Sequence, residues 1–299
     1  MAAAAARARD GLGPADRGRY DALCALAAQG GPAVAGVPVR ALAAGAPLRA
    51  IEALAARWPS LSPRDRAQVG APLGGGRPGP LHLAGAPVRQ TDATTCGSAV
   101  LGALAAAGNP LLALWLVTGD LAGGHRPPEL RHAPPAALAS GDAAARFATL
   151  QRALQGASTR RALGPVGWPR ALGTPPWGAA RVARWPGVRF RAHLLDDTDG
   201  PHLDAALDRA DAALAAGVPV PLFTGGDLGT GLTTAVPRHV VLLVPGVRPT
   251  DDGTHPGYAV LEPGQGRVHR VGRDRLAAPG GPHPALGGWS HVCWVLLPA

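Results

Sequence analysis

Short runs of apolar and β-branched residues, each bounded by glycine or proline, mark the last third of the chain. Such runs are typical of β-strands, and we expect them to form an antiparallel sheet. The expected strands are 218–224 (VPVPLFT), 239–245 (HVVLLVP), 258–263 (YAVLEP), 266–272 (GRVHRVG) and 290–298 (SHVCWVLLP). The stretch 246–257 is polar and rich in turn-forming residues, so a hairpin loop is expected there.

Apolar positions recur at helical spacing before these strands. One helix is expected to begin at Cys96 and to end at Gly108, and Asn109–Pro110 then supply the N-cap and first residue of a second helix. Further helices are expected at about 142–155 and at 203–217. Because helices come first and strands last, the pattern predicts an α+β fold in which a helical half packs on a C-terminal antiparallel β-sheet.

The first 75 residues or so are rich in alanine and low in complexity. Two weakly amphipathic pieces, at 18–28 and 47–57, predict short helices or partly ordered sequence. A linker is expected at 70–80 (GAPLGGGRPGP), because glycine loosens the chain and proline cannot continue a helix. We therefore expect a helical or partly disordered N-terminal extension over 1–78 and a main domain over 79–299.

The charge of the chain does not indicate a nucleic-acid partner. The net charge is +9 and all 29 basic residues are arginine, but they are scattered and interleaved with aspartate. A groove that tracks nucleic acid also needs stacking aromatic residues, and only 4% of the chain is aromatic. We expect no nucleic-acid binding.

The chain also lacks the sequence patterns of membrane, disulfide and metal proteins. No run approaches the ~18 uninterrupted apolar residues of a membrane helix, and no signal peptide is evident, so a cytoplasmic location is expected. Cys24, Cys96 and Cys293 are odd in number and far apart, which argues against a disulfide framework. There is no CxxC pair or HExxH motif, and we expect neither a metal nor a cofactor. Cys24 and Cys293 are expected to be packing residues.

Cys96 stands at the start of a predicted helix. A thiol is a useful nucleophile only as the thiolate, which the unsatisfied N–H groups and positive dipole end of a helix N-terminus favour. The small residues Gly97 and Ser98 leave room for a substrate carbonyl. We expect Cys96 to be a nucleophile.

A thiolate nucleophile needs a base, and His239 is the best candidate among ten histidines. It opens the apolar run HVVLL, so a strand would fix its backbone while its side chain lies at the strand end. His269 and His291 also fall on predicted strands and are reserve candidates. Glu262 closes the expected neighbouring strand and could accept a hydrogen bond from the second nitrogen of His239.

Gln90 lies six residues before Cys96. Acyl transfer requires donors for the developing oxyanion, and a side-chain amide plus the backbone N–H of the nucleophile is a sufficient pair. The intervening loop TDATT is short enough to bring Gln90 back beside Cys96. Gln90 is therefore the expected oxyanion donor.

Three segments together resemble the peptidase C39-like branch of the papain-like cysteine peptidases. They are PVRQTDATTCGSAVLGAL (87–104), RHVVLLV (238–244) and YAVLEPGQGRVHRV (258–271). The resemblance covers about 85–118 and 218–297 and implies a papain-like fold. It also implies that Gln90 is the oxyanion glutamine, Cys96 the nucleophile and His239 the general base. Glu262 stands where the family usually has aspartate.

The resemblance implies a cysteine peptidase that cleaves a peptide or protein substrate through a thioacyl intermediate on Cys96. Two alternatives stay open. An acyltransferase or transpeptidase would use the same residues with an amine or thiol as acceptor. A catalytically inactive C39-like binding module would keep the fold without the chemistry, and the glutamate at position 262 is the departure that raises this possibility.

Overall fold

A computed structural model describes residues 1–226, 238–246, 257–277 and 281–299. Most of the hairpin loop expected at 246–257, with His255 inside it, lies outside these residues. Over the described parts the chain is a mixture of helices and a largely antiparallel sheet, which confirms the predicted α+β class.

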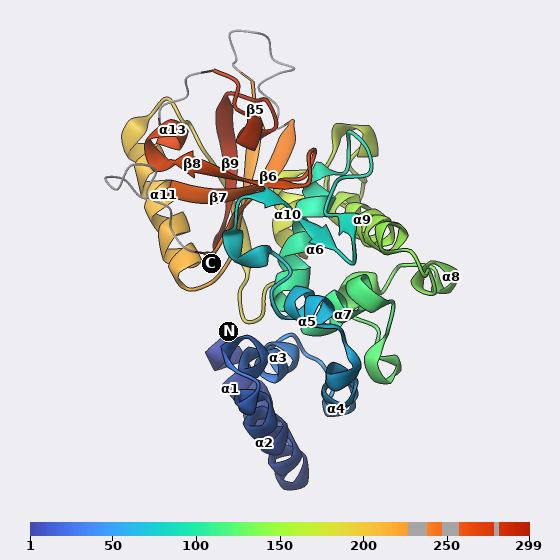
Figure 1. The fold of residues 1–299 in the computed structure, drawn as a ribbon. Coiled ribbons are helices and arrows are strands. Elements are labelled where there is room, and N and C mark those ends of the chain that lie inside the picture. Colours follow the sequence, from blue (N-terminus) through green and yellow to red (C-terminus); the bar gives the residue numbers. More distant parts are fainter. Residues whose placement is uncertain (227–237, 247–256, 278–280) are drawn as a thin grey trace.

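The described strands form one large sheet and one short hairpin (Figure 1). In spatial order the large sheet contains β1 (Gly79–Pro80), β8 (Arg267–Gly272), β7 (Gly257–Glu262), β6 (His239–Val244), β5 (Val220–Gly225), β9 (His291–Pro298) and β4 (Phe190–Leu194). Every neighbouring pair of these strands is antiparallel. The separate hairpin pairs β2 (His82–Leu83) with β3 (Ala86–Pro87). All five predicted strands are present, within about two residues of the expected bounds.

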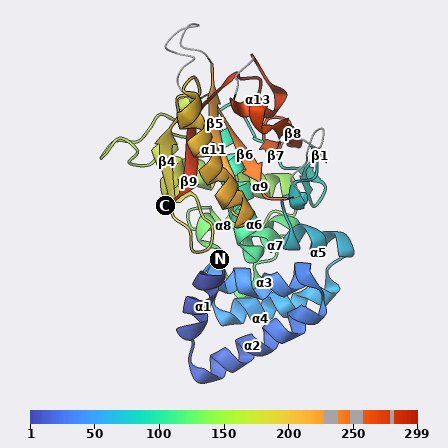
Figure 2. The same ribbon diagram turned by 90° about the vertical axis from the view of Figure 1, so that its left-hand side faces the viewer.

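The central strands are continuous apolar runs because helices cover both faces of the sheet. All six residues of β5, β6 and β7 are buried, as in sheets that are covered on both faces. On one face lie α6 and α10, and on the other lies α11 (Figure 2). The edge strand β4 was not predicted, because its arginine and histidine interrupt the apolar pattern.

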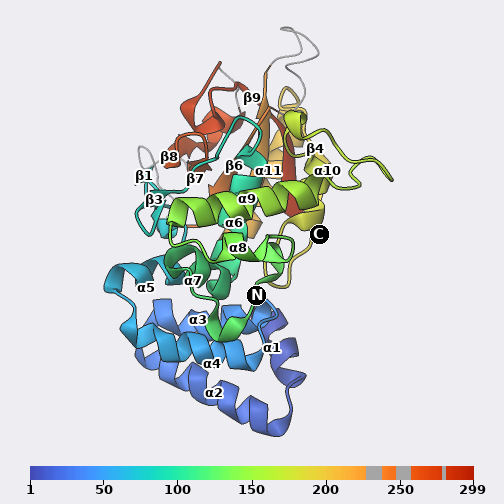
Figure 3. The same cartoon turned by 90° about the vertical axis from the view of Figure 1, so that its right-hand side faces the viewer.

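The helices that follow residue 95 begin with α6, which carries the first candidate residue, Cys96, at its start. Their bounds are α6 (Cys96–Gly108), α7 (Pro110–Thr118), α8 (Pro135–Leu138), α9 (Ala143–Thr159), α10 (Pro176–Val182), α11 (Gly200–Ala215) and α13 (Arg273–Ala277). Asn109 caps α7 as predicted, since its Oδ1 accepts from the N–H of Leu111 at 3.1 Å. Helix α9 lies across α6 (Figure 3).

Neither α6 nor α7 is long enough to cross a membrane. No single helix in the described residues is both long and apolar enough, and only the pair α6 and α7 passes such a test together, with a bend of 114° between them. Both helices are almost entirely buried in the core.

The first 70 residues fold into helices that stack beneath the rest of the molecule (Figures 2 and 3). Their bounds are α1 (Ala2–Asp10), α2 (Pro14–Gln29), α3 (Pro32–Ala43), α4 (Leu48–Arg57) and α5 (Pro63–Gly70). Helices α3, α4 and α5 contact α7, and buried residues of both regions belong to one hydrophobic core. The boundary near residue 78 stays a prediction.

Candidate active site

His239 and Glu262 meet at one end of the sheet. Strands β6 and β7 pair in the register Leu242 with Leu261, which brings the first residue of β6 close to the last residue of β7. His239 Nε2 lies 2.7 Å from Glu262 Oε1, and both side chains are buried. The predicted pairing of these strands is confirmed, and it joins the two side chains as expected.

The turn that follows β7 holds the Glu262 carboxylate. The N–H of Gly264 donates to Oε1 at 2.6 Å, and the N–H of Gln265 donates to Oε2 at 2.7 Å. Burial by itself raises the pKa of Glu262, but the hydrogen bonds from His239, Gly264 and Gln265 outweigh burial and lower it below the ordinary value. The longer glutamate side chain thus folds back over its own turn, and the carboxylate stays ionised beside His239.

Cys96 also interacts with the imidazole of His239. It is the first residue of α6 and is 4% exposed. Burial alone lowers the pKa of His239, but the interaction with Cys96 and the hydrogen bond to Glu262 reverse the direction and raise it to about 9. Because Nε2 faces Glu262, Nδ1 is the nitrogen left for the sulfur. The structure therefore joins three predicted residues in the order Cys96, His239, Glu262.

Gly287 closes the remaining side of the His239 ring. Its φ of +70° is left-handed, and a Cβ at this position would lie 2.7 Å from His239 Nε2. The turn is fixed by the Thr224 hydroxyl, which donates to the carbonyl of Leu286 at 2.9 Å. Glycine is needed here so that the turn can rest on the imidazole and restrict its rotation. Sequence reasoning did not identify Gly287, although the Gly-Gly pair before the last strand marks a special turn.

The backbone of Gln90 is hydrogen-bonded to the turn that follows β7. Its N–H donates to the carbonyl of Pro263 at 2.8 Å, so the Gln90 loop runs beside the turn that holds Glu262. Its side-chain Nε2 donates to the carbonyl of Asp92 at 2.8 Å. An amide nitrogen carries two hydrogens, which leaves one for another acceptor. Its Oε1 is buried and has no hydrogen-bond partner among the described residues.

Two glutamines of α9 hold the loop that leads to Cys96. Gln151 is fully buried; it donates to the carbonyl of Arg89 at 3.0 Å and accepts from the N–H of Thr91 at 3.1 Å. Gln155 donates to the hydroxyl of Thr94 at 3.0 Å. Sequence reasoning missed both residues, although two glutamines four positions apart on an otherwise apolar helix face are a detectable signal.

The Thr95 hydroxyl closes the same loop from within. It accepts from the N–H groups of Thr91 and Asp92, both at 3.0 Å. Five residues between Gln90 and Cys96 are therefore fixed by hydrogen bonds within the loop and from α9. The loop is a rigid support for the start of α6.

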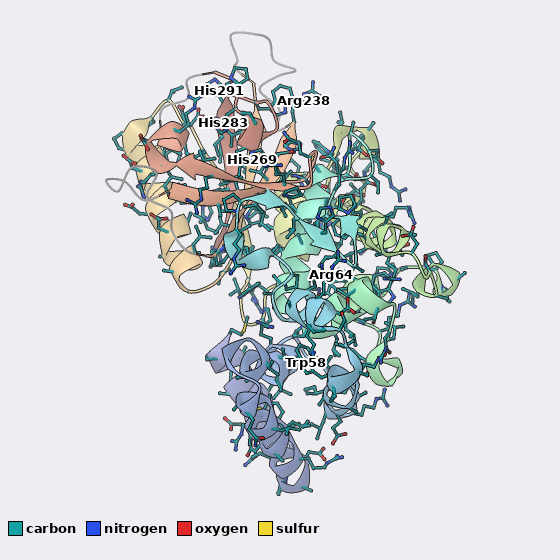
Figure 4. All side chains as sticks on the ribbon, in the orientation of Figure 1. Trp58, Arg64, Arg238, His269, His283 and His291 are labelled. Atoms are coloured by element: carbon teal, nitrogen blue, oxygen red, sulfur yellow. The ribbon has the colours of Figure 1, made fainter. Side chains whose placement is uncertain are left out.

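The two reserve histidines lie elsewhere on the sheet. Figure 4 shows His269, His283 and His291 around the sheet, while Arg64 and Trp58 lie lower, toward the N-terminal helices. His269 Nε2 is buried and has no hydrogen-bond partner among the described residues. His291 Nδ1 lies 3.0 Å from Asp197 Oδ1. Among the histidines of the described residues whose pKa is shifted, only His239 is affected by Cys96.

No candidate metal site is found. In the described part of the chain, no group of three or more histidine, cysteine or acidic side chains could hold a metal ion. The three cysteines are free thiols. In comparisons with known proteins, no family model, curated protein or solved structure matches the chain.

Proposed function

We propose that this chain is a papain-like, C39-like cysteine hydrolase that cleaves an amide bond through a thioacyl intermediate on Cys96. The observation that supports the proposal most is the hydrogen bond between His239 and Glu262, together with the interaction of the same imidazole with Cys96 at the first residue of α6. A helix that carries the nucleophile and packs on an antiparallel sheet that carries the base is the arrangement expected of this fold.

The reaction begins with a pair formed by the Cys96 thiolate and the His239 imidazolium. The raised pKa of His239, about 9, means that the ring keeps its proton at neutral pH when it faces the sulfur and the carboxylate. The thiolate attacks the amide carbonyl carbon, and the carbonyl oxygen becomes an oxyanion. The Cys96 N–H and the second Gln90 amide hydrogen stabilise that charge.

His239 then completes the first half of the reaction. Its Nδ1–H protonates the leaving amine as the carbon–nitrogen bond breaks, which leaves a thioester on Cys96 and a neutral imidazole. The neutral ring next takes a proton from water, the resulting hydroxide attacks the thioester, and the carboxylic acid product leaves as the thiolate returns. Glu262 stays ionised throughout and holds Nε2 in place.

Acyl transfer to an amine or thiol is the second candidate function, and the burial of the nucleophile favours it. Cys96 is 4% exposed and His239 is 8% exposed, so bulk water has little direct access to the thioester in the described residues. Slow hydrolysis gives a competing acceptor more time to react. A peptide or protein substrate and a cytoplasmic location stay predictions.

Labelling with a reactive electrophile tests the shared first step. The full chain is incubated with a peptidyl chloromethyl ketone or epoxide and digested for mass spectrometry. We expect selective modification of Cys96 that the variant His239→Ala abolishes. Modification of Cys24 or Cys293 at the same rate as Cys96 would contradict both functions. Addition of an amine or thiol acceptor to an acylated enzyme then separates transfer from hydrolysis.

A further inference from the structure

A polar cavity lies at the end of α6 that is opposite to Cys96. Its volume is about 190 Å³, and it is lined by the end of α3, the end of α6, the segment around Glu129 and the segment 183–188 after α10. The N-terminal helices contribute Ala43 and Ala44 to its wall. The cavity therefore lies where the first 70 residues meet the rest of the molecule, about 18 Å along α6 from the proposed nucleophile.

Glu129 is an incompletely paired carboxylate in this cavity. Its side chain is 2% exposed, and its Oε2 has no hydrogen-bond partner among the described residues. The Arg184 Nε is 3.9 Å from the other oxygen, which is beyond hydrogen-bond distance. Burial raises the pKa of Glu129, although its own backbone, Arg184 and Asn109 act to lower it. A cation bound at Oε2 would offset the cost of ionising this carboxyl group.

Trp185 also lines this cavity. Its Nε1 is buried and has no hydrogen-bond partner among the described residues. Gly108 brings the indole close to the end of α6, since a Cβ at position 108 would lie 3.2 Å from the Trp185 ring. The residues that line the cavity thus include one unpaired acceptor and one unpaired donor, together with Arg184, whose side chain is 52% exposed.

These groups match the two charges of an amino acid. A primary ammonium would pair with Glu129 Oε2. A carboxylate would accept from the Trp185 N–H and from Arg184. The remaining wall presents methyl groups of Ala43, Ala44 and Val188, which suit a short aliphatic side chain.

We propose that this cavity binds a free α-amino acid with a small aliphatic side chain, its ammonium on Glu129 and its carboxylate on Trp185 and Arg184. The binding site is separate from the proposed hydrolase site and does not depend on its chemistry. Because Ala43 and Ala44 come from the N-terminal helices, a bound amino acid would also fasten these helices to the body of the protein.

Isothermal titration of the full chain with L-valine tests the site, and two analogues each remove one charge. Valinamide keeps the ammonium and lacks the carboxylate, whereas N-acetyl-L-valine keeps the carboxylate and lacks the ammonium. We expect L-valine to bind at least about tenfold more tightly than either analogue, because each charge makes a charge-assisted hydrogen bond. Equal binding of valinamide would point to a peptide amino terminus and would overturn the proposal.

Variants assign each charge to its residue. Glu129→Gln should weaken L-valine binding at least about tenfold, while Glu52→Gln, at a partly exposed surface glutamate, should leave it unchanged. Arg184→Ala should weaken L-valine binding but leave valinamide binding unchanged, and this half-exposed position tolerates truncation even if Glu129→Gln fails to fold.

Two results test this binding proposal separately from the proposed hydrolase function. Cys96→Ala should bind L-valine like the unaltered chain, so a failed hydrolase proposal leaves this test intact. Absence of binding by any of the three probes at about 50 mM, well above millimolar dissociation constants, would show that the cavity holds only water and would overturn the inference.

Discussion

Two regions of the described chain combine a cysteine, a histidine and a carboxylate, and one of them has its cysteine at the start of a helix. Cys96, His239 and Glu262 form one group, with a His–Glu distance of 2.7 Å. The other group pairs His291 with Asp197 at 3.0 Å, and Cys293 lies two residues further along β9. Both groups therefore contain the same kinds of residue and a hydrogen-bonded pair of a histidine and a carboxylate.

The difference lies in what faces the sulfur. Cys96 begins a helix and interacts with His239. Cys293 is in a strand, where burial and the charge of Asp197 raise the pKa of its thiol to about 12. The two thiols therefore differ in their local backbone and in their nearest ionisable group, although the residue types around them are alike.

Replacing the histidine of each group in turn should give the largest difference between the two regions. His239→Ala takes away the partner of the Cys96 sulfur, so the rate at which a peptidyl electrophile labels Cys96 should fall about a thousandfold. His291→Ala is the matched control and should leave that rate unchanged. The rates are followed by mass spectrometry of the Cys96 peptide. Equal effects of the two variants would contradict the assignment of His239.

The charge on His239 should appear in the pH dependence of stability. The folded-state pKa of about 9 exceeds the ordinary 6.5, so the stabilisation is fully present below pH 6.5 and is lost as pH rises through 9. The loss should reach about 3 kcal/mol in the free energy of unfolding. Urea denaturation at several pH values measures it.

Glu262→Gln should make the same pH profile shallower. The variant removes the negative charge that helps to hold the proton on His239, so less stability is lost between pH 6.5 and 9. Glu52→Gln, at a partly exposed glutamate, should retain the full decline. An unchanged profile for Glu262→Gln would mean that the carboxylate does not govern the imidazole.

Substitution of the adjacent residues Gly287 and Gly288 should have a smaller and more local effect on the labelling of Cys96. In Gly287→Ala the new methyl group would meet the His239 ring, and labelling of Cys96 should slow about thirtyfold as the imidazole is displaced. In Gly288→Ala the methyl group would meet nothing within 4 Å, although φ is +82° there. That control should cost about 1–2 kcal/mol of stability and leave labelling unchanged. Both the labelling rate and the unfolding midpoint are measured.

The smallest expected effect concerns the loop before the nucleophile. Gln151→Leu leaves the carbonyl of Arg89 without its partner, while the N–H of Thr91 keeps the Thr95 hydroxyl as acceptor. The variant should lower stability by about 1 kcal/mol and the labelling rate about tenfold. Gln68 is a close match, because it donates to the carbonyl of His82 and accepts from the N–H of Ala84, away from the site. Gln68→Leu should therefore affect stability alone. A labelling rate that also falls in Gln68→Leu would indicate general loosening.

The strands and helices that could be predicted from the sequence share one property. Their pattern of apolar residues follows directly from which positions are buried. The runs at β5, β6 and β7 are continuously apolar because both faces are covered, and α6 ends where glycine and an Asn-Pro cap demand it. The edge strand β4 was missed because arginine and histidine interrupt its apolar pattern. Helix α5 was missed although Ser62 and Asp65 form its cap, a signal that was present in the sequence.

The residues of the candidate site also fall into those that the sequence predicts and those that it does not. The sequence sufficed for Cys96, His239 and Glu262, because a helix start and two paired strand ends bring them together. Gly287 could not be predicted, since its role depends on a turn that returns over the His239 ring from far along the chain. Gln151 also acts across 60 residues, and only the packing of α9 on α6 shows which backbone groups it meets.

The central claim is that His239 and the start of α6 activate Cys96, and labelling of two cysteines in one molecule tests it most directly. The unaltered chain is treated with iodoacetamide at pH 7, and the rates at Cys96 and Cys293 are read from their peptides. Cys96 is the more buried of the two, so accessibility alone favours Cys293. The account predicts that Cys96 reacts at least about tenfold faster than Cys293 and faster than free cysteine. A Cys96 that reacts no faster than free cysteine would contradict it.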